Sequence, residues 1–590
     1  MCFTKSNLVV VFFVFMLLFA SVELSAAAID EKSLPANEQK LLNTVDHWGL
    51  PFSDQLRRFS SGADNLKAEM KEKTPENFII GIQHGLEKIP LNKYWFKGQY
   101  TSKVSVKAAQ NEYENFQIAV LPRIGKTLGK VTLRADGLHH KTGKYTIPED
   151  KIKIYRVAYV ETQQACYPSL YTGKWPDPLL PNDVTSISGT DLGLFWVEVF
   201  VPKDAQPGMY NGILILEADN EKVEISLSLE VYSFALPDRV EFPLTVWTGK
   251  GLPWGTEMDL EANRQLWKML LEHSIDPISV GKEYFSFENM DFKTLDENIE
   301  YCLEKGLQVF EIPRADSNSL APLISHLREH GYLKKAMIYS ADDEPDDETF
   351  ANKIIPAYNK MHSAYPDLRV FQATEYHPDI DKGCDIWLND LSTAKGIEFA
   401  MQNKGKAELW AYYCHLPIHI DYCRPLITAP NMLIDNEAIE HRLAFWIAWK
   451  YKIKGMFIYA GNHGWGNSGI DSKNWEKTGW KLPSPDMPLT YPYAGVHNGN
   501  GYLIYPGPCP SIRMKVLRDG MEDLGYFTIL DNIVAKAKNK NLKKQAQQLL
   551  SVSPDVFVNS HYFNRDTSAL LANRDDIAKM IENITEHEKK

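Results

Sequence analysis

The chain lacks most of the short motifs that assign a function by themselves. Its 590 residues include seven cysteines, widely spaced and without a C-x-x-C pair, which argues against zinc-ribbon and thiol-redox sites. The sequence shows no phosphate-binding loop and no Ser-His-Asp pattern, and His463 and His497 do not have the spacing of zinc ligands. The formal net charge is -12, and no Lys/Arg cluster offsets it. We therefore expect no metal, no cofactor and no nucleic-acid partner.

Long apolar runs are also scarce, and the one that concerns a membrane lies at the N-terminus. Lys5 precedes a continuous apolar run over residues 8–20, and small residues follow at 25–28. This order is typical of a secretory signal, and the run is short for a spanning helix. We expect residues 1–28 to be a signal peptide, with an uncleaved anchor as the alternative. The mature protein is then exported, periplasmic or extracellular, and has no stable membrane span.

Hydrophobic periodicity divides the remaining chain into four regions. Residues 29–95 are polar and irregular, with short helical patterns. Residues 96–236 contain short runs of alternating apolar and polar residues separated by turn formers, which predicts a β-sandwich domain. Residues 237–511 alternate strand-like and amphipathic helical runs, and residues 512–590 are helical.

The third region has the repeat number of a TIM-like barrel. Its candidate strands are residues 242–247, 277–280, 308–312, 336–340, 369–374, 385–388, 408–413 and 455–459. Eight β-α repeats predict a (β/α)8 barrel, and a doubly wound open sheet is the structural alternative. The expected fold is thus a multidomain protein with an N-terminal β-sandwich, a (β/α)8 catalytic barrel and C-terminal helices.

The end of the fourth candidate strand carries an unusual acidic run. In KAMIYSADDEP the apolar run ends at three carboxylates, Asp342, Asp343 and Glu344, followed by Pro345. Ionised groups beside an apolar core lose hydration, so their position needs a reason. Active sites of such barrels lie at the carboxyl ends of the strands. Asp346 and the two acids after it are better explained as the start of a helix, where negative charge is favoured.

Other candidate strands also end in polar or aromatic residues. These ends are Trp247-Thr248, Arg314 to Asp316, Glu375-Tyr376-His377, Asn389-Asp390, Tyr412-Tyr413 and the run from Ala460 to Trp465. A single aspartate at a strand end is more often a helix cap than a catalytic residue. Acids, amides and aromatic rings gathered on one face, however, are suited to protonating, binding and stacking on a sugar. Adjacent acids, with Pro345 keeping Glu344 out of helical geometry, suit a mechanism in which the substrate supplies its own nucleophile.

At these residues the chain resembles glycoside hydrolase family 123. The matching segments are LFWVEVFVPKDAQPGMYNGILIL, IYSADDEP, ELWAYYC, AFWIAWKYKIKGMFIYAGNHGW and GYLIYPGPCPSIRMKVLRDGMEDLGY, in this order. The resemblance implies an exo-acting, retaining β-N-acetylgalactosaminidase that acts on glycans with a terminal N-acetylhexosamine. In the last segment we expect Arg518 to form a structural ion pair with Asp519 or Asp523.

The resemblance also implies residue roles. Glu344 is expected to be the general acid and base, and Asp343 to hold the 2-acetamido group of the substrate. Further substrate contacts are expected from Tyr412, Trp410, Trp465, Asn462, His463, Glu375 and Asp390. Tyr412 and Trp410 are two residues apart on a strand and so share one face, with Trp410 deeper in the protein.

Two alternatives remain open at this point. A glycosidase of other sugar specificity could use Glu344 as the acid and Glu375 or Asp390 as a protein nucleophile. A non-catalytic, carbohydrate-binding surface protein would need the acids only as helix caps.

Overall fold

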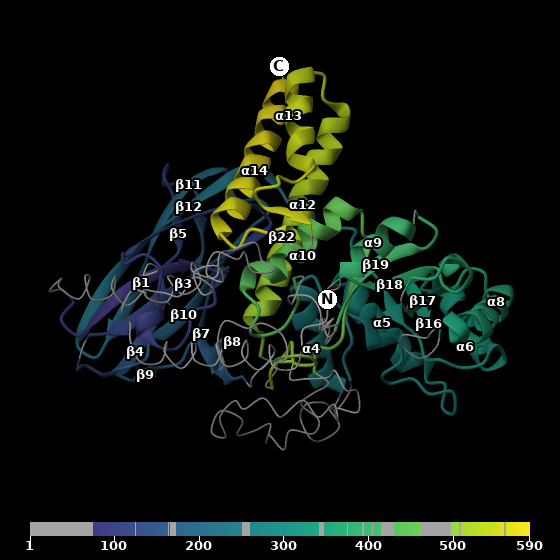
Figure 1. The fold of residues 1–590 in the computed structure, drawn as a ribbon. Helices are drawn as coiled ribbons and strands as arrows, with labels where there is room; N and C mark the ends of the chain where they lie inside the picture. Colours follow the sequence, from purple (N-terminus) through teal and green to yellow (C-terminus); the bar gives the residue numbers. More distant parts are fainter. Residues whose placement is uncertain are drawn as a thin grey trace, which may run out of the picture.

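The computed structural model describes thirteen stretches of the chain (Figure 1). They are residues 75–123, 125–162, 165, 173–249, 260–340, 347–374, 376–391, 394–403, 405–414, 430–462, 497–506, 509–559 and 562–589. The expected signal peptide and most of the expected irregular segment therefore lie outside the described residues. None of the described helices is long and apolar enough to span a membrane.

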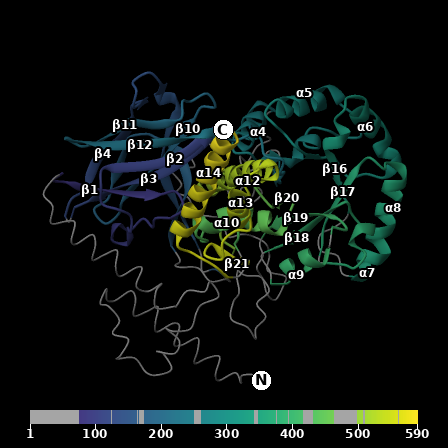
Figure 2. The same cartoon turned by 90° about the horizontal axis from the view of Figure 1, so that it is seen from above.

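The N-terminal part of the described chain is rich in strands and forms two sheets (Figure 1, Figure 2). The first has the order β1-β3-β10-β7-β8, and the second has the main order β2-β12-β11-β4-β9 with β5 and β6 beside it. The strands are β1 (Phe78–His84), β2 (Lys103–Gln110), β3 (Glu112–Pro122), β4 (Leu128–Ala135), β5 (Leu138–His140), β6 (Thr146–Ile147), β7 (Ile152–Glu161), β8 (Lys174–Pro181), β9 (Thr185–Ile187), β10 (Gly193–Val201), β11 (Gly208–Ala218) and β12 (Glu221–Ala235).

Apolar side chains of both sheets meet in one buried cluster. Ile118 and Phe195 come from the first sheet, and Leu214 and Leu227 from the second. β1 pairs with β3 from Phe78 onward, so the strand-rich region begins before residue 96, where the sequence placed its start. The pairing of β1 with a strand far along the chain is not encoded in the local pattern of residues 29–95.

The following region forms one eight-stranded parallel sheet. Each of the eight candidate runs overlaps a strand: β13 (Leu244–Val246), β14 (Asp276–Pro277), β15 (Phe310–Glu311), β16 (Ala336–Tyr339), β17 (Arg369–Ala373), β18 (Ile386–Asp390), β19 (Glu408–Tyr413) and β20 (Gly455–Ile458). The second run, 277–280, shares only Pro277 with its strand, because the residues after it form a 3-10 helix. Their order is β14-β13-β20-β19-β18-β17-β16-β15. The first strand β13 pairs with the last strand β20, a closure that an open doubly wound sheet does not have. The sheet is thus a nearly closed, barrel-like sheet.

β14 and β15 are the two edge strands of this sheet, and a glycine after β14 allows the chain to contact β15 closely. Gly281 closes the short 3-10 helix Ile278–Gly281 that follows β14. A Cβ added at Gly281 would lie 2.4 Å from Cδ2 of Phe310 and 2.6 Å from the carbonyl oxygen of Glu311. Only glycine fits this contact without a shift of the β15 backbone.

Helices cover the outer side of the parallel sheet (Figure 2). They are α4 (Leu260–Glu272), α5 (Phe292–Leu303), α6 (Ser317–Glu329), α7 (Asp347–Thr349), α8 (Ile355–Ala364), α9 (Ala394–Asn403) and α10 (Ala438–Tyr451). The alternate residues of the strands face inward and form a separate cluster that includes Met337, Phe371, Leu388 and Trp410. The interior of the sheet is therefore packed with side chains, and space for a ligand is expected only at its edges.

The C-terminal region is helical, as the sequence predicts, and its first helix is deeply buried. It contains α12 (Ile512–Lys536), α13 (Lys540–Leu550), α14 (Thr567–Lys589) and the short strands β21 (Phe557–Asn559) and β22 (Tyr562–Phe563). The side chain of Ser511 caps α12 by accepting a hydrogen bond from the N–H of Met514. α12 packs against α10 and α14 and also contacts β3 and β8. Both views show it between the N-terminal sheets and the barrel-like sheet (Figure 1, Figure 2).

Ion pairs with almost no solvent exposure attach α12 to the first sheet. Glu198 of β10 accepts from Lys515 at 3.0 Å and from Arg518 at 2.6 Å. Arg513 pairs with Asp177 of β8 at 2.8 Å. The structural role expected for Arg518 is confirmed, but its ion-pair partner is Glu198, on a distant strand, rather than Asp519 or Asp523.

Replacing Glu198 with glutamine should destabilise the fold strongly. The variant would leave the buried cations of Lys515 and Arg518 without their carboxylate, a loss of about 3–5 kcal/mol for a broken buried pair. We expect a lower Tm and a lower urea midpoint for Glu198→Gln, whereas Glu217→Gln, an exposed position on β11, should change neither. Equal midpoints for the two variants would contradict this role.

The same pair predicts a pH dependence of stability. Burial opposes ionisation of Glu198, but the charges of Arg518 and Lys515 outweigh it and hold its pKa below the usual value of 4.5. The contribution of this carboxylate is therefore complete above about pH 4.5 and is lost as the pH falls further. The difference in unfolding midpoint between the wild type and Glu198→Gln should accordingly shrink on acidification below that pH.

Candidate active site

The acidic run follows the C-terminal end of β16. The described residues stop at Ser340 and resume at Asp347, where α7 begins, so Asp343 and Glu344 themselves lie outside them. The N–H of Ser340 donates to the carbonyl of Phe371 at 3.0 Å, so the chain is still paired with β17 at this point. Glu375, His463 and Trp465 also lie outside the described residues.

Aromatic rings line the inner face of the sheet toward its C-terminal edge. We call this set the aromatic floor; it consists of Trp247, Tyr339, Phe371, Tyr412, Phe457 and Tyr459. Ring centroids are 5.6 Å apart for Trp247 and Tyr459, 5.0 Å for Tyr339 and Phe371, and 5.7 Å for Tyr412 and Phe457. Tyr339 directly precedes the residues that lead into the acidic run, so the aromatic floor extends to the strand that carries the acids.

Tyr412 and Trp410 share the inner face of β19, as their spacing predicts. Trp410 is fully buried, and its indole N–H donates to Glu408 at 2.8 Å, toward the start of the strand. The ring also packs against the backbone of Gly455, where a Cβ would lie 2.6 Å from it. Tyr412 lies two residues further toward the C-terminal end of β19, and the residue is 8% exposed. This geometry makes Trp410 a packing residue and leaves Tyr412 as the residue of the two that is nearer the C-terminal edge.

Asp390 and Tyr412 are brought together on neighbouring strands. They are register partners in the pairing of β18 with β19, and Asp390 shares the inner face of β18 with Leu388. The pKa of Tyr413 is raised well above its usual value by burial and, to a smaller extent, by the nearby charge of Asp390. Asp390 therefore lies at the C-terminal edge of the parallel sheet, which we call the mouth, where the sequence predicts a substrate contact.

Asn462 lies beyond the end of β20 and connects it to the end of β13. Its side-chain oxygen accepts from the N–H of Gly249 at 3.0 Å, and its amide nitrogen donates to the carbonyl of Gly249 at 3.0 Å. The side chain has no solvent exposure. These bonds favour a positioning role for Asn462, and the sugar hydroxyl contact expected for it stays a prediction.

One buried carboxylate at the mouth is absent from the residues that the sequence singled out. Glu283 follows the second candidate strand and is 9% exposed. It accepts from the hydroxyl of Thr248 at 3.2 Å and from the amide of Asn263 at 2.5 Å. The signal that could have identified it is its position just after the second candidate strand, 277–280, which matches the position of the acidic run after the fourth candidate strand.

Asp316, in contrast, is a helix cap. Its carboxylate accepts from the N–H groups of Asn318 and Ser319 at the start of α6. The hydrogen bond from the Ser319 hydroxyl, followed by those from the backbone, lowers the pKa of Asp316. Arg314, two residues earlier, lies over the ring of Tyr339 at 5.5 Å and so belongs beside the aromatic floor.

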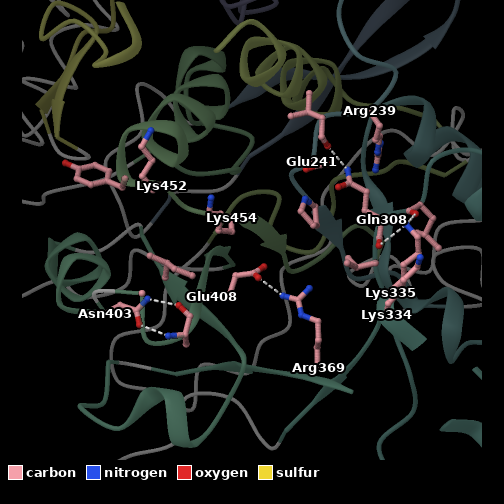
Figure 3. Close-up of a pocket in the computed structure, with 18 of the residues that line it drawn as sticks. Arg239, Glu241, Gln308, Lys334, Lys335, Arg369, Asn403, Glu408, Lys452 and Lys454 are labelled. Carbon is pink, nitrogen blue, oxygen red and sulfur yellow. Dashed lines mark hydrogen bonds and ion pairs between the residues drawn. The ribbon is translucent and has the colours of Figure 1, made fainter. Parts of the chain in front are cut away.

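A surface pocket opens at the opposite edge of the sheet (Figure 3). It is lined by residues at the starts of strands, including Gln308, Arg369 and Glu408, the last two joined by an ion pair of 2.8 Å. This edge is remote from the ends of β16, β18 and β19. Because barrel enzymes place their chemistry at the C-terminal edge, we do not assign the active site to this pocket.

Comparison with known protein families decides the assignment. A family model described as the catalytic domain of glycoside hydrolase 123 matches residues 313–530, and one described as the N-terminal domain of glycoside hydrolase 123 matches residues 93–218. Together they cover more than half of the chain. The chain belongs to glycoside hydrolase family 123. As a glycoside hydrolase it acts on a glycan. The catalytic match extends into α12 as far as residue 530, consistent with the burial of that helix beside the sheet.

A solved structure supports the same fold. A family 123 glycoside hydrolase from Clostridium perfringens, studied for glycolipid glycan hydrolysis, superposes with a TM-score of 0.62 at 15% identity, over 87% of this chain and 99% of that chain. A β-glucuronidase from Parabacteroides merdae reaches a TM-score of only 0.28 at 9% identity, over 76% of this chain and 54% of that chain. No curated protein sequence matches the chain.

The positioning role of Asn462 can be separated from substrate binding. Asn462→Ala would leave the N–H and the carbonyl of Gly249 without this partner, at a cost of about 1–3 kcal/mol. We expect a lower Tm for Asn462→Ala and an unchanged Tm for Asn318→Ala, an exposed control. An unchanged Tm with a raised KM would instead indicate that Asn462 contacts the sugar.

Proposed function

We propose that the protein is an exo-acting, retaining β-N-acetylgalactosaminidase that uses the 2-acetamido group of its substrate as the nucleophile. The observation that carries this proposal is the position of the acidic run. It lies within the matched catalytic region and follows β16 at the edge where Tyr339, Asp390 and Tyr412 gather. Glycolipid glycans with a terminal N-acetylgalactosamine are the first natural substrates to test, because the Clostridium perfringens enzyme was studied for glycolipid glycan hydrolysis.

In the first step Glu344 donates a proton to the glycosidic oxygen. Asp343 accepts a hydrogen bond from the acetamido N–H and holds the acetamido carbonyl against the anomeric carbon. The carbonyl oxygen forms a bond to that carbon as the glycosidic bond breaks, and the leaving alcohol departs with the proton. The product is an oxazolinium-like intermediate whose positive charge Asp343 offsets. Attack within one molecule removes the entropic cost of bringing in a separate nucleophile.

In the second step the ionised Glu344 removes a proton from water. The water oxygen bonds to the anomeric carbon, the oxazolinium ring opens, and the acetamido group is regenerated. Two displacements at one carbon retain its configuration. Glu344 must be protonated at the start of each cycle, and a neighbouring carboxylate favours this state because two adjacent negative charges repel.

The aromatic floor provides the apolar surface against which the sugar ring packs. Tyr412 keeps some exposure at this surface, and we assign its hydroxyl to the acetamido carbonyl. Trp465 and His463 are assigned to the same sugar, and Glu375 and Asp390 to its hydroxyls. The two N-terminal sheets, which share one buried cluster, form a β-sandwich that supports the barrel. Residues 1–28 direct export to the periplasm or the extracellular space.

The direct test is a set of aryl β-glycosides that differ only at C2 and C4. Substrate assistance requires the 2-acetamido group, so hydrolysis should be confined to the N-acetyl compounds, and the galacto compound should be the better substrate. Turnover of a substrate with a 2-hydroxyl group at a similar rate would favour a protein nucleophile such as Glu375 or Asp390. No turnover of any glycoside would favour a carbohydrate-binding protein.

Mutation should distinguish the catalytic roles proposed for Asp343 and Glu344 from the role of the acidic residues near them. Glu344→Gln removes the general acid and base and should lower kcat/KM by about 10²–10⁴-fold. Asp343→Asn weakens charge stabilisation and should lower kcat by about 10²-fold or more. Glu348→Gln, an exposed residue in the same acidic stretch, is the matched control and should keep full activity. Unchanged hydrolysis in Glu344→Gln would contradict the proposal.

Tyr412→Phe tests the contact between the floor and the substrate. Phenylalanine keeps the packing against Phe457, so Tm should not change. Loss of one hydrogen bond to the developing charge should lower kcat by about 10-fold to 100-fold on the N-acetyl substrate. A loss of stability with unchanged kcat would place Tyr412 in the core only.

A further inference from the structure

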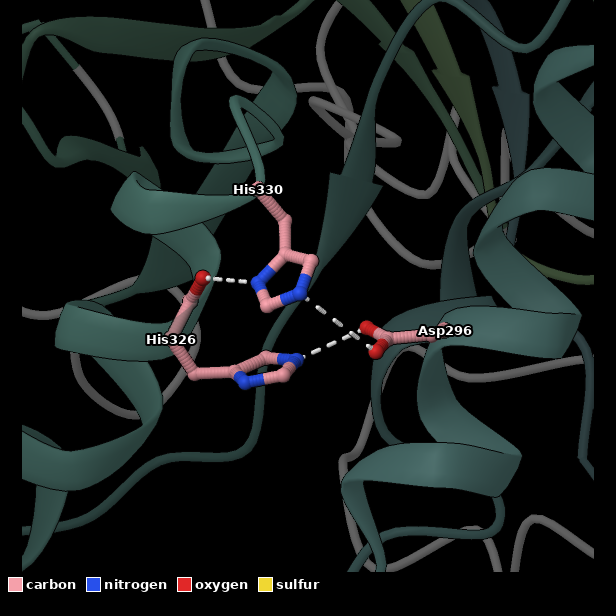
Figure 4. Close-up of side chains that lie close together, drawn as sticks. All are labelled: Asp296, His326 and His330. Carbon is pink, nitrogen blue, oxygen red and sulfur yellow. Dashed lines mark hydrogen bonds and ion pairs between the residues drawn. The ribbon is translucent and has the colours of Figure 1, made fainter.

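Three potential metal ligands converge on the outer side of the barrel-like sheet. They are Asp296 of α5, His326 of α6, and His330, which ends α6 (Figure 4). The two histidines are four residues apart, which places both on one face of the helix. Asp296 faces them from the neighbouring helix. The cluster lies among the covering helices and not at the strand ends, so it is separate from the candidate active site.

Both imidazole rings turn the same nitrogen toward the carboxylate. Nε2 of His326 is 2.8 Å from Oδ1 of Asp296, and Nε2 of His330 is 4.0 Å from Oδ2. Nδ1 of His330 is 2.9 Å from the carbonyl oxygen of His326, so Nδ1 is the donor and carries a proton. In the neutral ring, Nε2 of His330 then has a lone pair directed at the space beside Asp296.

Packing holds the rings in this orientation. Phe292 stacks on His326 with ring centroids 4.2 Å apart, and the rings of His326 and His330 are 4.1 Å apart. Asp296 and His326 are 22% and 15% exposed, and His330 is 42% exposed. A hydrogen bond between His326 and Asp296 explains the position of His326 alone, because the 4.0 Å separation of His330 from the carboxylate is too long for a hydrogen bond.

Although the sequence motifs predict no metal, we propose that Asp296, His326 and His330 bind one divalent transition-metal ion of the zinc class. An ion with bonds of about 2.0–2.1 Å in tetrahedral geometry holds its ligands about 3.3 Å apart. The observed separations of 2.8 Å and 4.0 Å lie on either side of that value, so small side-chain rotations suffice. Two imidazoles favour zinc, nickel, copper or cobalt over magnesium and calcium, which prefer oxygen ligands.

The ion would join α5 to α6 and leave one coordination position to water beside the exposed ring of His330. Its effect is structural, because the ligands come from helices on the outer face and none from a strand end. Binding to the folded state alone raises stability in proportion to the affinity. This inference does not depend on the proposed glycosidase mechanism.

The test uses the full-length protein, purified without a histidine tag and stripped with EDTA. On addition of zinc chloride we expect about one zinc per chain to remain after gel filtration and Tm to rise. Cobalt chloride should give the intense visible absorption of a tetrahedral site. Glycoside hydrolysis should be equal in the stripped and reloaded protein.

Two ligand variants and one control make the test specific. His330→Ala, at the most exposed ligand, and Asp296→Asn should each weaken zinc affinity by at least about 10-fold and abolish the rise in Tm. His587→Ala, at an exposed position on α14, should bind zinc as the wild type does. Zinc retention and Tm shifts that are the same in His330→Ala and the wild type would overturn the proposal, as would no retention by the wild type.

Discussion

Buried ion pairs on α12 are the constraint on which the arrangement of this protein depends. Taking a charge out of water costs several kcal/mol, and the cost is offset only when the partner charge sits at hydrogen-bond distance. α12 meets this condition on two sides. Lys515 and Arg518 reach Glu198 in the first sheet, and Asp523 accepts from Arg442 of α10 at 2.6 Å. A shift of the sheets against the barrel would leave these charges buried and unpaired, so the pairs fix the orientation more than they add stability.

The same constraint reaches the candidate active site through α10. This helix connects the end of β19 to the start of β20, and it is buried along most of its length because α12 covers the side away from the sheet. β19 supplies Tyr412, and the chain after β20 supplies Tyr459 and Asn462. The positions of Tyr412, Tyr459 and Asn462 therefore depend on α10, which the ion pair between Arg442 and Asp523 joins to α12.

Side chains packed on the inner face of the parallel sheet lie between its N-terminal edge and its C-terminal edge. Trp410 fills the interior and bonds to Glu408 toward the N-terminal edge, where Arg369 and Glu408 form an ion pair. The rings of the aromatic floor lie nearer the C-terminal edge than Trp410 does. At that edge β18 ends at Asp390, and the chain after β16 continues to Asp343 and Glu344. A packed interior leaves the C-terminal edge for the proposed catalytic residues, and the outer helices can carry other features, such as the cluster around Asp296.

The sequence by itself determined the local features of this protein. Periodicity located the eight strands of the parallel sheet, the second of them by one shared residue only, together with the start of α12 at Ile512 and the shared face of Trp410 and Tyr412, because these depend on neighbours along the chain. Only the tertiary structure decided the pairing of Arg518 with Glu198, the pairing of β1 with β3, the bonds of Asn462 to Gly249, and the place of Glu283 at the mouth. Each of these joins residues far apart in sequence, and no local pattern of hydrophobicity or charge encodes which distant partner a side chain meets.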